Sequence, residues 1–509
     1  MKKILGLAFS VFMVFMLASF SSFAEDFEVL QGKEDGIVEG QYYLGTAYEN
    51  ITWGRLPNKD SKPVMTVPSG ATVTIDTLSH EGVLEDQGKD PVKYFMSKGV
   101  PENQILNIGK ELTASDKPHD FDKDGPHVVT GPIYVEGAEP GDVLKVEVLS
   151  LYPRVPYGVI SNRHFKGVLV GEFPENEGRL PGADKDHPER YNNISIFTPI
   201  KKVGDEYFGY LNENGHELSF PLFPFLGIMG VANATSESLS SIPPTRLGGN
   251  LDINELGVGS TLYLPVDVKG ALFFTGDPHF VQGDGEVALT ALEGSLRGTV
   301  RLTVLKKGST AIPGNPEKFD MCFGETEDFW IPIGLNQDLD EAMKQSVRES
   351  INFLSKQTGI DRKTVYAYLS AATDYEVSQA VDKTKGIHAL IQKRDFKEFI
   401  KVLLTDGKTT IPAAVQKEGL FVDIKTFAGL IGGKATVKKD TATLTVNGKK
   451  YTFTAGSNKY SVGSSTVILS KSPYSDGVFY IPTDVILKIM KMPLNWSSDG
   501  TVITGKIGF

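Results

Sequence analysis

Three pairs of polar side chains within a glycine-rich stretch give the strongest chemical signal in this sequence. The stretch runs from Gly248 to Gly294 and contains the pairs Asn250 and Asp252, Asp277 and His279, and Asp284 and Glu286. Residues two apart on an extended segment share a face, so the members of each pair should point together. Carboxylates and imidazoles are the groups that hold metal ions and move protons in enzymes. The pattern predicts a site built on loops at strand ends.

A structural interpretation of the same residues competes with this one. Asp284 in Gly283-Asp-Gly285 is an ordinary turn residue, and a turn role is as good a prediction for it as a chemical one. His279 follows Pro278, so it could equally be a hydrogen-bonded loop histidine. Composition alone favours a site here, but it does not assign roles.

Several well-known catalytic patterns are missing from the sequence. It contains no Gly-x-Ser-x-Gly elbow, no Ser-Ser-Lys segment, and no His-Glu-x-x-His, P-loop or dinucleotide motif. Cys322, with Glu325 nearby, is the one candidate thiol nucleophile, but no activating base is apparent in its Met321-Cys-Phe-Gly324 setting. We therefore expect neither a serine nor a cysteine nucleophile.

The order and spacing of several segments resemble the acetamidase/formamidase family. The central segments are Gly248-Gly-Asn-Leu-Asp252, Gly259-Ser-Thr-Leu-Tyr-Leu-Pro-Val266, Gly270-Ala-Leu272, Gly276-Asp-Pro-His279 and Gln282-Gly-Asp-Gly-Glu286. Two upstream segments also fit, Asp76-Thr-Leu-Ser-His80 and the run from Thr130 to Asp142. The resemblance extends to about Phe399. The chain departs from the family pattern at Leu247, where many members have His, and at Pro278 and Phe280, where small residues are common.

The resemblance implies hydrolysis of a small, formamide-like or acetamide-like carboxamide, with a divalent metal, zinc above all, that activates water. It also implies a homo-oligomer. On this basis Asp76, His80, Asp277, His279 and His127 are the candidate metal ligands. Glu286 is the candidate general base, with His279 and Asp252 as further catalytic residues, and Asn250 and Gln282 are the candidate substrate-binding residues. The competing hypothesis is an exported surface-binding protein that keeps the fold without catalysis.

The elements that must position these residues are mainly strands. From Asp26 to about Ile333 the sequence alternates between apolar and polar residues in short segments separated by Gly and Pro, which favours a β-sandwich or barrel with long loops. The clearest predicted strands are 71–76, 142–148, 261–266 and 298–304.

From Asp338 to about residue 400 the apolar period becomes helical. Leu339, Met343, Val347, Ile351 and Leu354 recur at helical spacing behind an expected Asp338 cap. Asp361 and Asp374 are expected to cap two more helices, and Asp374 and His388 are interpreted as structural. The catalytic domain is therefore predicted over residues 25–405, β-rich to about 335 and helical over 338–400.

A small α+β module is predicted over residues 406–509. Its segments 422–431 and 481–490 form a weak repeat, each followed by a strand with an Asp turn, at Asp440 and Asp499. The module resembles the copper amine oxidase N-terminal-like domain of exported Gram-positive proteins. It contains neither His nor Cys, so we expect no copper site. We interpret it as a stalk or adhesion module that contacts the cell wall.

Charge and cysteine content exclude two further classes. The net charge of −11 argues against nucleic acid as a partner, because phosphate recognition needs clustered Lys and Arg. With a single cysteine, Cys322, the chain can form no internal disulfide. Its stability outside the cell must therefore come from packing.

The first 24 residues are predicted to be a signal peptide. Lys2 and Lys3 precede an apolar run from Ile4 to Leu17, which is shorter than the roughly 20 residues that a bilayer span needs. Small residues at Ser22 and Ala24 suit cleavage after Ala24. Intact-mass analysis of secreted material should therefore show a chain that begins at Glu25, whereas a membrane-bound form that retains Met1 would contradict the prediction.

Overall fold

The computed structural model describes residues 27–314, 316–399, 401–405, 410–416, 419–469, 471–476, 478–483, 485, 494–498 and 502–507. The predicted signal peptide lies outside these ranges. The chain divides into two compact units, of which the larger contains most of residues 1–391 and the smaller contains residues 392–509 with two short upstream segments. Among the described residues, no helix is both long enough and apolar enough to cross a bilayer.

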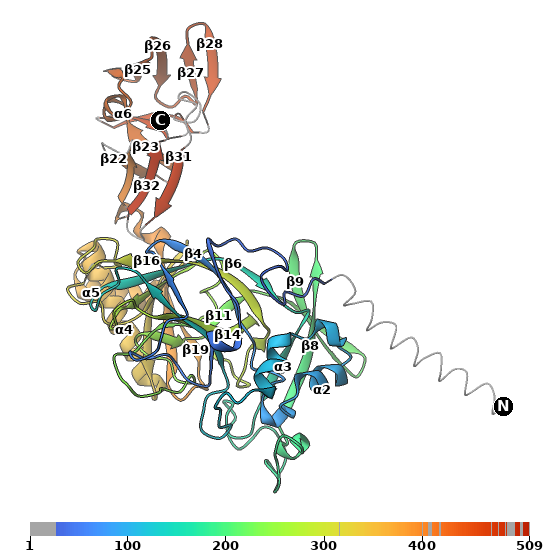
Figure 1. Cartoon of the computed structure of the whole chain (residues 1–509). Coiled ribbons are helices and arrows are strands. Elements are labelled where there is room, and N and C mark those ends of the chain that lie inside the picture. The colour runs from blue at the N-terminus through green and yellow to red at the C-terminus, as the bar shows by residue number, and fades with distance from the viewer. Residues whose placement is uncertain are drawn as a thin grey trace, which may run out of the picture. The chain divides into compact units, whose positions relative to one another are not determined.

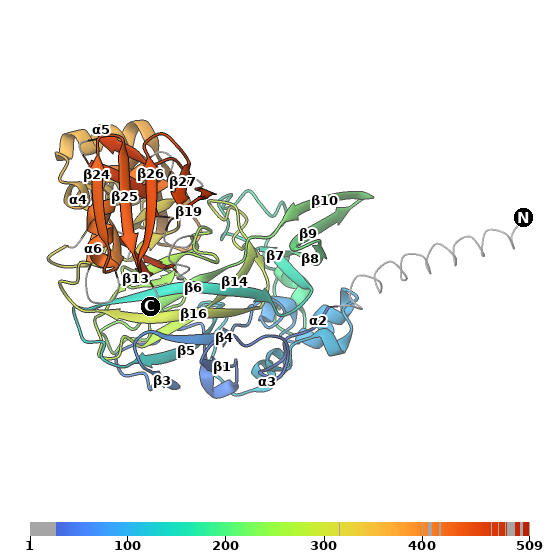
Figure 2. The same cartoon turned by 90° about the horizontal axis from the view of Figure 1, so that it is seen from above.

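Two large β-sheets form the larger unit (Figure 1, Figure 2). The first sheet has nine strands, in the order β1 (Tyr42–Leu44), β4 (Ala71–Asp76), β16 (Leu296–Leu305), β6 (Val143–Pro153), β13 (Thr261–Pro265), β17 (Phe323–Glu325), β18 (Phe329–Asn336), β20 (Lys385–Gln392) and β19 (Thr373–Gln379). The four clearest strands predicted from the sequence all lie in it, as β4, β6, β13 and β16.

The second sheet has eleven strands. Eight follow the order β10 (His216–Pro221), β9 (Glu206–Glu213), β8 (Ile194–Val203), β7 (Tyr157–Asn162), β15 (Leu292–Glu293), β14 (Phe273–Val281), β11 (Phe225–Val231) and β12 (Gly248–Asn250). β5 (Val128–Val135) pairs with β14 and also with β2 (Ile51–Trp53) and β3 (Met65–Val67).

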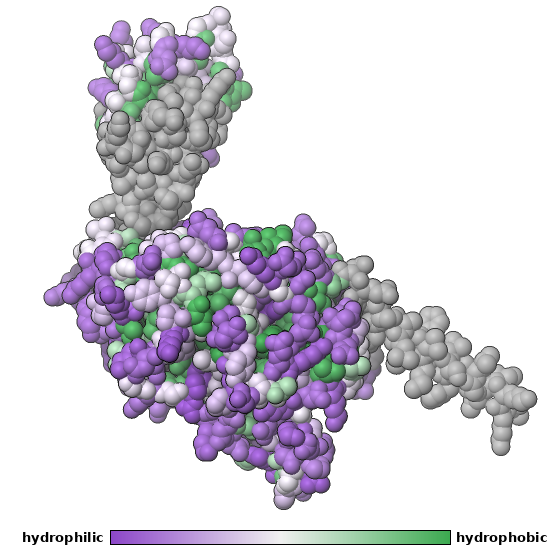
Figure 3. Space-filling view, viewed as in Figure 1, coloured by the Kyte–Doolittle hydropathy of each residue, from purple (hydrophilic) through white to green (hydrophobic). Residues whose placement is uncertain are grey.

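A shared apolar core joins the two sheets. Val146 and Val300 of the first sheet and Leu226 and Phe273 of the second belong to one cluster of buried side chains. The predicted β-rich α+β fold is thereby confirmed. The side chains on the face of this unit shown in Figure 3 are mostly hydrophilic, with scattered apolar patches.

Four α-helices accompany the sheets within the described part of the larger unit: α2 (Pro91–Ser97), α3 (Asn107–Ala114), α4 (Leu339–Thr358) and α5 (Arg362–Ala372). The expected caps of α4 and α5 are present, because Asp338 Oδ1 accepts from Glu341 N at 3.0 Å and Asp361 Oδ1 accepts from Lys363 N at 3.0 Å.

The buried face of α4 differs from the prediction by about one position. Its buried residues are Ala342, Ser346, Ser350, Phe353 and Leu354, whereas Met343 is exposed. A Cβ added at Gly334 of β18 would come within 2.4 Å of Ser346 N. The helix backbone therefore lies directly on the sheet, and only small side chains fit at that contact.

The helical prediction for residues 373–392 is wrong. Asp374 caps no helix but lies in β19, which pairs antiparallel with β20. The segment from Thr373 to Gln379 alternates polar and larger side chains. Its backbone N–H and C=O groups are hydrogen-bonded by pairing with the apolar strand β20. Asp374 and His388 therefore stand on strands.

The smaller unit, coloured orange to red in Figure 1, contains two sheets and α6 (Ile424–Leu430). The seven-stranded sheet has the order β29 (Tyr474–Asp476), β30 (Val478–Pro482), β23 (Gly419–Asp423), β22 (Thr410–Gln416), β21 (Lys401–Thr405), β32 (Val502–Ile507) and β31 (Leu494–Ser498). The five-stranded sheet has the order β24 (Lys434–Lys438), β25 (Thr441–Val446), β26 (Lys449–Thr454), β27 (Lys459–Val462) and β28 (Ser465–Ile468).

The smaller unit begins earlier than the predicted boundary at residue 405. Strand β21 pairs with β22 and β32, so residues 401–405 belong to the small module rather than to the larger unit. The module has its own apolar cluster around Phe427, Phe453 and Phe479. The helix and Asp turn of the first repeat are present as α6 and the β24–β25 turn, while most of residues 484–493 and Asp499 lie outside the described residues.

Candidate active site

Buried ionisable side chains from both sheets converge in the larger unit. They come from the loop after β4, the start of β5, strands β14 and β15, and the loops that follow β12, β14 and β19. The cluster consists of His80, His127, Asp252, Asp277, His279, Glu286, Glu293 and Asp382, all of which are buried. Within it, four overlapping groups of three offer ligand atoms that lie within 4.8 Å of one another.

Two histidines face one aspartate at the centre of this cluster. His80 Nδ1 lies 3.7 Å from Asp277 Oδ1, and His127 Nε2 lies 3.7 Å from the same oxygen. Ligands about 2.0–2.1 Å from a tetrahedral zinc ion are about 3.3 Å apart, so these separations match such an ion with small adjustments. The three residues can supply two nitrogens and one oxygen to one cation.

Each of these histidines has an outer partner on its other ring nitrogen. His80 Nε2 lies 3.3 Å from Glu81 Oε1, and His127 Nδ1 lies 2.9 Å from Ser241 Oγ. Glu81 is in turn paired with Arg163 at 3.2 Å. Metal-binding histidines have this arrangement, in which an outer hydrogen bond orients the ring and fixes its tautomer.

His279 lies deeper and pairs with two carboxylates. Its Nε2 is 3.1 Å from Asp277 Oδ2 and 3.0 Å from Glu293 Oε1. Despite burial, Glu293 and Asp277 raise the pKa of His279 well above its usual value. In turn, although burial alone would raise the pKa of Asp277, His127 and His279 hold it below the ordinary range. A protonated His279 would keep Asp277 ionised.

A second part of the cluster is purely acidic. Burial, followed by repulsion from Asp382 and Asp277, raises the pKa of Glu286 well above its ordinary value. Burial, followed by repulsion from Glu286 and Asp382, does the same for Asp252. Burial raises the pKa of Asp382 to about 7. Asp382 can therefore exchange protons near neutral pH, and the carboxyl groups of Glu286 and Asp252 hold their protons more tightly than ordinary ones do.

The backbone at three acidic residues is unusual. Asp252, Asp277 and Glu286 have φ values of 50°, 49° and 48°, a left-handed conformation that costs side-chain-bearing residues about 1–3 kcal/mol each. Gly227 lies beneath them, and a Cβ there would come within 2.5 Å of Asp252 Oδ1 and 2.7 Å of Asp277 Oδ2. Such strain, concentrated at one place, is typical of a functional site.

Many polar atoms of the cluster make no hydrogen bond within the chain although they are buried. They include Nδ1 of His80 and of His279, both carboxylate oxygens of Asp252, and one carboxylate oxygen each of Asp277 and Glu293. Each such atom costs about 1–3 kcal/mol if it stays unsatisfied. A bound divalent cation would satisfy several at once and would offset the excess negative charge, so the donor set fits a metal ion.

A cavity of about 240 Å³ opens onto the cluster. His80, His127, Asp277, Glu286, Glu293, Asn250 and Asp382 line its polar wall, while Phe121, Ile242 and Leu289 contribute apolar surface. At about 30 Å³ per water molecule, it has room for a small amide and several waters. Asp252 and His279 do not line this cavity. They affect its chemistry only through lining residues beside them, His279 through Asp277 and Glu293, and Asp252 through Glu286 and Asp382.

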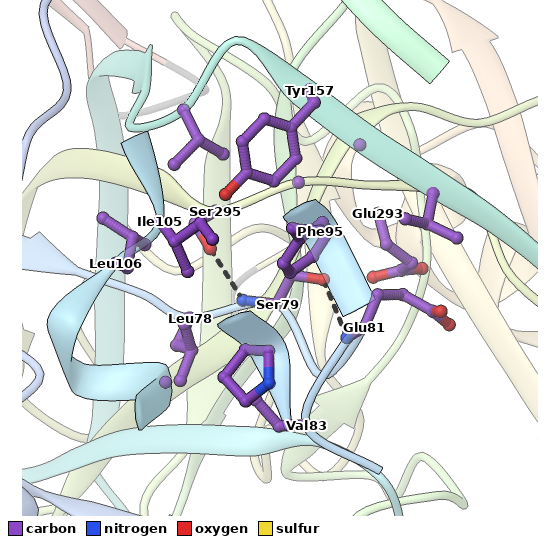
Figure 4. Close-up of a pocket in the computed structure, with 16 residues that line it drawn as sticks. Leu78, Ser79, Glu81, Val83, Phe95, Ile105, Leu106, Tyr157, Glu293 and Ser295 are labelled. Atoms are coloured by element: carbon purple, nitrogen blue, oxygen red, sulfur yellow. Dashed lines mark hydrogen bonds between the residues drawn. The ribbon is translucent and has the colours of Figure 1, made fainter. Parts of the chain in front are cut away.

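The segment that carries His80 is held from behind (Figure 4). Ser79 N donates to Ser295 Oγ at 3.0 Å, and Glu81 N donates to Ser79 Oγ at 3.2 Å. A mainly apolar cavity of about 30 Å³, lined by Leu78, Phe95 and Tyr157, lies behind it. It is too small for a substrate, so we assign it to packing.

Asp76 does not join His80 in the metal cluster, which corrects the prediction from the sequence. Its carboxylate is fully buried against Arg297, at 2.7 Å and 3.0 Å, and accepts from Tyr43 Oη at 2.5 Å. Arg154 approaches to 3.6 Å. Asp76 ends β4, but the chain then turns, so its shared parity with His80 does not survive.

Asp76→Asn should therefore destabilise the protein without removing metal. Loss of one partner from a buried ion pair costs about 3–5 kcal/mol, because the arginines keep their charge. Chemical denaturation would measure the fall in the free energy of unfolding, and elemental analysis would show an unchanged metal content. Loss of metal with unchanged stability would return Asp76 to the metal site.

The other predicted residues have mixed placements. Asn250 lines the cavity, and its Nδ2 donates to Asp382 Oδ2 at 2.9 Å while its Oδ1 makes no hydrogen bond within the chain. Gln282 does not line the cavity, since its Nε2 donates to the carbonyls of Asp252 and Ser378, so it positions loops rather than substrate. Asp284 and Glu286 do not point together, because the chain leaves extended geometry between them.

Three site residues carry little signal in the sequence. Glu293 is placed by the ladder between β14 and β15, where it lies opposite His279. Asp382 comes from the loop between β19 and β20, a segment with a helical prediction. Glu81 simply follows His80 and contacts it at 3.3 Å. Strand pairing, which the sequence does not reveal, places Glu293 and the loop that carries Asp382 at the cluster.

Comparison with known proteins shows the families that the two parts of this chain match. The family model described as Acetamidase/Formamidase family matches residues 106–236 and 224–392, more than half of the chain. The model described as Copper amine oxidase N-terminal domain matches residues 403–504.

The formamidase of Methylophilus methylotrophus is 28% identical over 233 residues, which cover 40% of this chain and 57% of that protein. The acetamidase of Mycolicibacterium smegmatis is 28% identical over 218 residues, which cover 35% of this chain and 53% of that protein. The chain thus spans about half the length of the curated relatives it matches.

Solved structures share the fold of the larger unit. A crystal structure of acetamidase from Bacillus halodurans has a TM-score of 0.52 and 26% identity, and the match covers 70% of this chain and 99% of that one. A structure of acetamidase from Yersinia enterocolitica has a TM-score of 0.52 and 23% identity, covering 69% and 92%, and shows the fold alone. By the extent of the family match, which includes every residue of the buried cluster after His80, this chain belongs to the acetamidase/formamidase family.

Proposed function

We propose that this chain hydrolyses a small carboxamide to a carboxylate and ammonia. The observation that carries the proposal is the set of His80, His127 and Asp277, which faces a cavity of suitable size directly beside Glu286. Formamidases and acetamidases among its relatives support the choice of a short aliphatic amide as substrate.

His80, His127 and Asp277 would hold the catalytic divalent ion, with zinc as the expected metal. A divalent ion at such a site lowers the pKa of water to about 7 and polarises the amide carbonyl. Three protein ligands leave a position for water or substrate. His279 and Glu293 keep Asp277 in place and ionised, and Glu81 and Ser241 orient the two imidazoles.

Glu286 would act as the general base and proton shuttle. It lines the same cavity, and its raised pKa suits a group that takes a proton from the attacking water and returns it to the leaving nitrogen. The Asn250 carbonyl oxygen has no partner in the chain, so it can accept a hydrogen bond from the substrate NH₂ group. Together these roles account for water addition and release of ammonia.

Ammonia release tests the proposal. The purified full-length protein should release ammonia from formamide or acetamide, lose this activity on chelation without unfolding, and regain it with added Zn²⁺. A folded, zinc-loaded protein that hydrolyses neither amide, nor a panel of larger amides and lactams, would favour the competing hypothesis of a binding protein.

The departures from the family pattern do not favour that competing hypothesis. Leu247 and Phe280 are buried in the apolar core, and Pro278 packs in β14 with its carbonyl accepting from Gly294 N at 3.0 Å. None of the three lines the cavity. They change packing around the site while leaving its acidic and histidine side chains in place.

For the smaller unit we propose a role at the cell surface of an exported protein. Its sequence match is to a domain named for copper amine oxidase, but residues 406–509 contain no His or Cys to bind copper. A chain that ends after Gln392 should therefore retain amide hydrolysis within about twofold, because every cluster residue precedes that point. The same truncation should shift activity from the cell-associated to the soluble fraction. Complete loss of turnover in a folded truncation would contradict this role.

A further inference from the structure

A second cluster of ionisable side chains lies outside the candidate active site. His388 of β20 faces Glu376, its cross-strand partner on β19, and Glu255 in the loop after β12. His388 Nε2 is 3.1 Å from Glu255 Oε2 and 3.6 Å from Glu376 Oε2. None of the three lines the cavity that contains Glu286.

The orientation of His388 is that of a metal ligand. Its side chain is 0% exposed, and its Nδ1 lies 2.8 Å from Ser378 Oγ, which fixes the ring. The opposite nitrogen, Nε2, is buried and faces the carboxylates of Glu255 and Glu376, at 3.1 Å and 3.6 Å. One ring nitrogen on an outer partner and the other directed at carboxylates is the usual arrangement around a metal ion.

The cluster also carries excess negative charge. Glu255, Glu376 and nearby Asp284 provide three carboxylates against the single imidazole of His388. Even a protonated His388 would leave the carboxylates with excess negative charge, so the cluster attracts a cation.

We propose that Glu255, Glu376 and His388 form a second, structural site for a divalent transition-metal ion. Their ligand atoms lie within 4.8 Å of one another, and the two measured separations bracket the roughly 3.3 Å expected between ligands of a tetrahedral zinc ion. A mixed imidazole and carboxylate set favours zinc over calcium or magnesium, which take oxygen ligands alone.

The site would fasten the loop that carries Glu286. Gly285 N donates to Ser378 O at 3.3 Å, and Ala380 N donates to Gly285 O at 3.1 Å, so this loop is tied to β19 beside Ser378. Gln282 Nε2 also donates to Ser378 O, at 3.0 Å. An ion that holds β19 at Glu376 and β20 at His388 would thus fix the strand to which the residues just before Glu286 are tied. This role does not depend on the proposed amide hydrolysis.

Zinc counting tests this site separately from the active site. Chelator-treated full-length protein is dialysed against Zn²⁺ and analysed for metal per chain by elemental mass spectrometry. Glu376→Gln and His388→Gln should each bind one zinc fewer than the parent, while Asp374→Asn, which removes an exposed carboxylate from the same strand, should bind as many. Glu376 is partly exposed, so its variant should fold even if the His388 variant does not.

Combination with an active-site variant makes the outcome specific. His127→Ala should remove a different zinc, so the double variant with Glu376→Gln should lose both. The His127→Ala chain keeps the second site and should still gain melting temperature on zinc addition, whereas the double variant should not. Unchanged zinc per chain in folded Glu376→Gln would overturn the proposal and leave His388 as an ion-pair partner. Displacement of this zinc by millimolar Ca²⁺ would overturn its assignment as a transition-metal site. Neither result would affect the test by ammonia release.

Discussion

His127→Ala is expected to weaken zinc binding by more than about 100-fold and to abolish amide hydrolysis at limiting zinc. Loss of even an outer partner of a metal ligand costs about 10–100-fold in metal affinity, and His127 is one of only three groups assigned to the ion. Excess zinc should restore part of the activity, because the other two ligands and Glu286 remain. Competition with a chromophoric chelator measures the affinity, and ammonia release at increasing zinc measures the rescue.

Two control variants bracket this result. Ser241→Ala removes the outer hydrogen bond to His127 Nδ1, so its zinc affinity should fall by about 10–100-fold, between those of the parent and His127→Ala. His119→Ala removes a histidine that lines the same cavity but stacks on Trp53, outside the cluster, so its zinc affinity should equal that of the parent. If His127→Ala binds zinc as tightly as His119→Ala does, the ion is held by another group of the cluster, of which Asp252, Asp277 and His279 are the first choice.

The strand-borne part of the site could be predicted because two-residue periodicity survives folding. Asp277 and His279 lie on one strand, and their side chains meet at 3.1 Å. Asp277 itself has a φ of 49°, but Pro278 between them stays in β14, so the pair remains together. The same argument fails for Asp284 and Glu286, because β14 has already ended and both Gly285, with a φ of 94°, and Glu286, with a φ of 48°, leave extended geometry. It also fails for Asp76 and His80, which are separated by the end of β4. Parity is informative only while the residues between the pair stay in a strand.

Long-range pairing determined the rest, and a single sequence does not contain it. The ladder between β14 and β15 brings Glu293 opposite His279, and the turn between β19 and β20 brings Asp382 beside Asn250. Local propensity even pointed the wrong way for residues 373–392, because their helical period was overridden by pairing in the first sheet. In α4 the caps were correct but the buried face was not, since the contact at Gly334 selects small side chains rather than large apolar ones.

Glu286→Gln is expected to lower kcat by about 10²–10⁴-fold while leaving zinc content and KM nearly unchanged. The amide keeps the shape of the side chain but cannot take a proton, and general acid–base catalysis contributes a factor of this size. The loss corresponds to about 3–5 kcal/mol of activation barrier. Asp122→Asn, which changes a cavity-lining carboxylate that pairs with Arg179 outside the cluster, should keep parental kcat and serves as the matched control.

If Glu286 is not the general base, another carboxyl group that lines the same cavity is the next candidate to carry the proton. Besides Asp277, which is assigned to the metal ion, Glu293 and Asp382 are buried carboxyl groups that line the cavity, and Asp382, with a pKa raised to about 7, is the better proton carrier of the two. Near-parental kcat in Glu286→Gln, with a large loss in Asp382→Asn, would move the proton role to Asp382 and leave Glu286 as a positioning residue. Near-parental kcat in both variants, with zinc still required for turnover, would mean that the metal ion activates the water without a carboxylate base. Glu293→Gln would then be expected to change kcat only through the contact of Glu293 with His279.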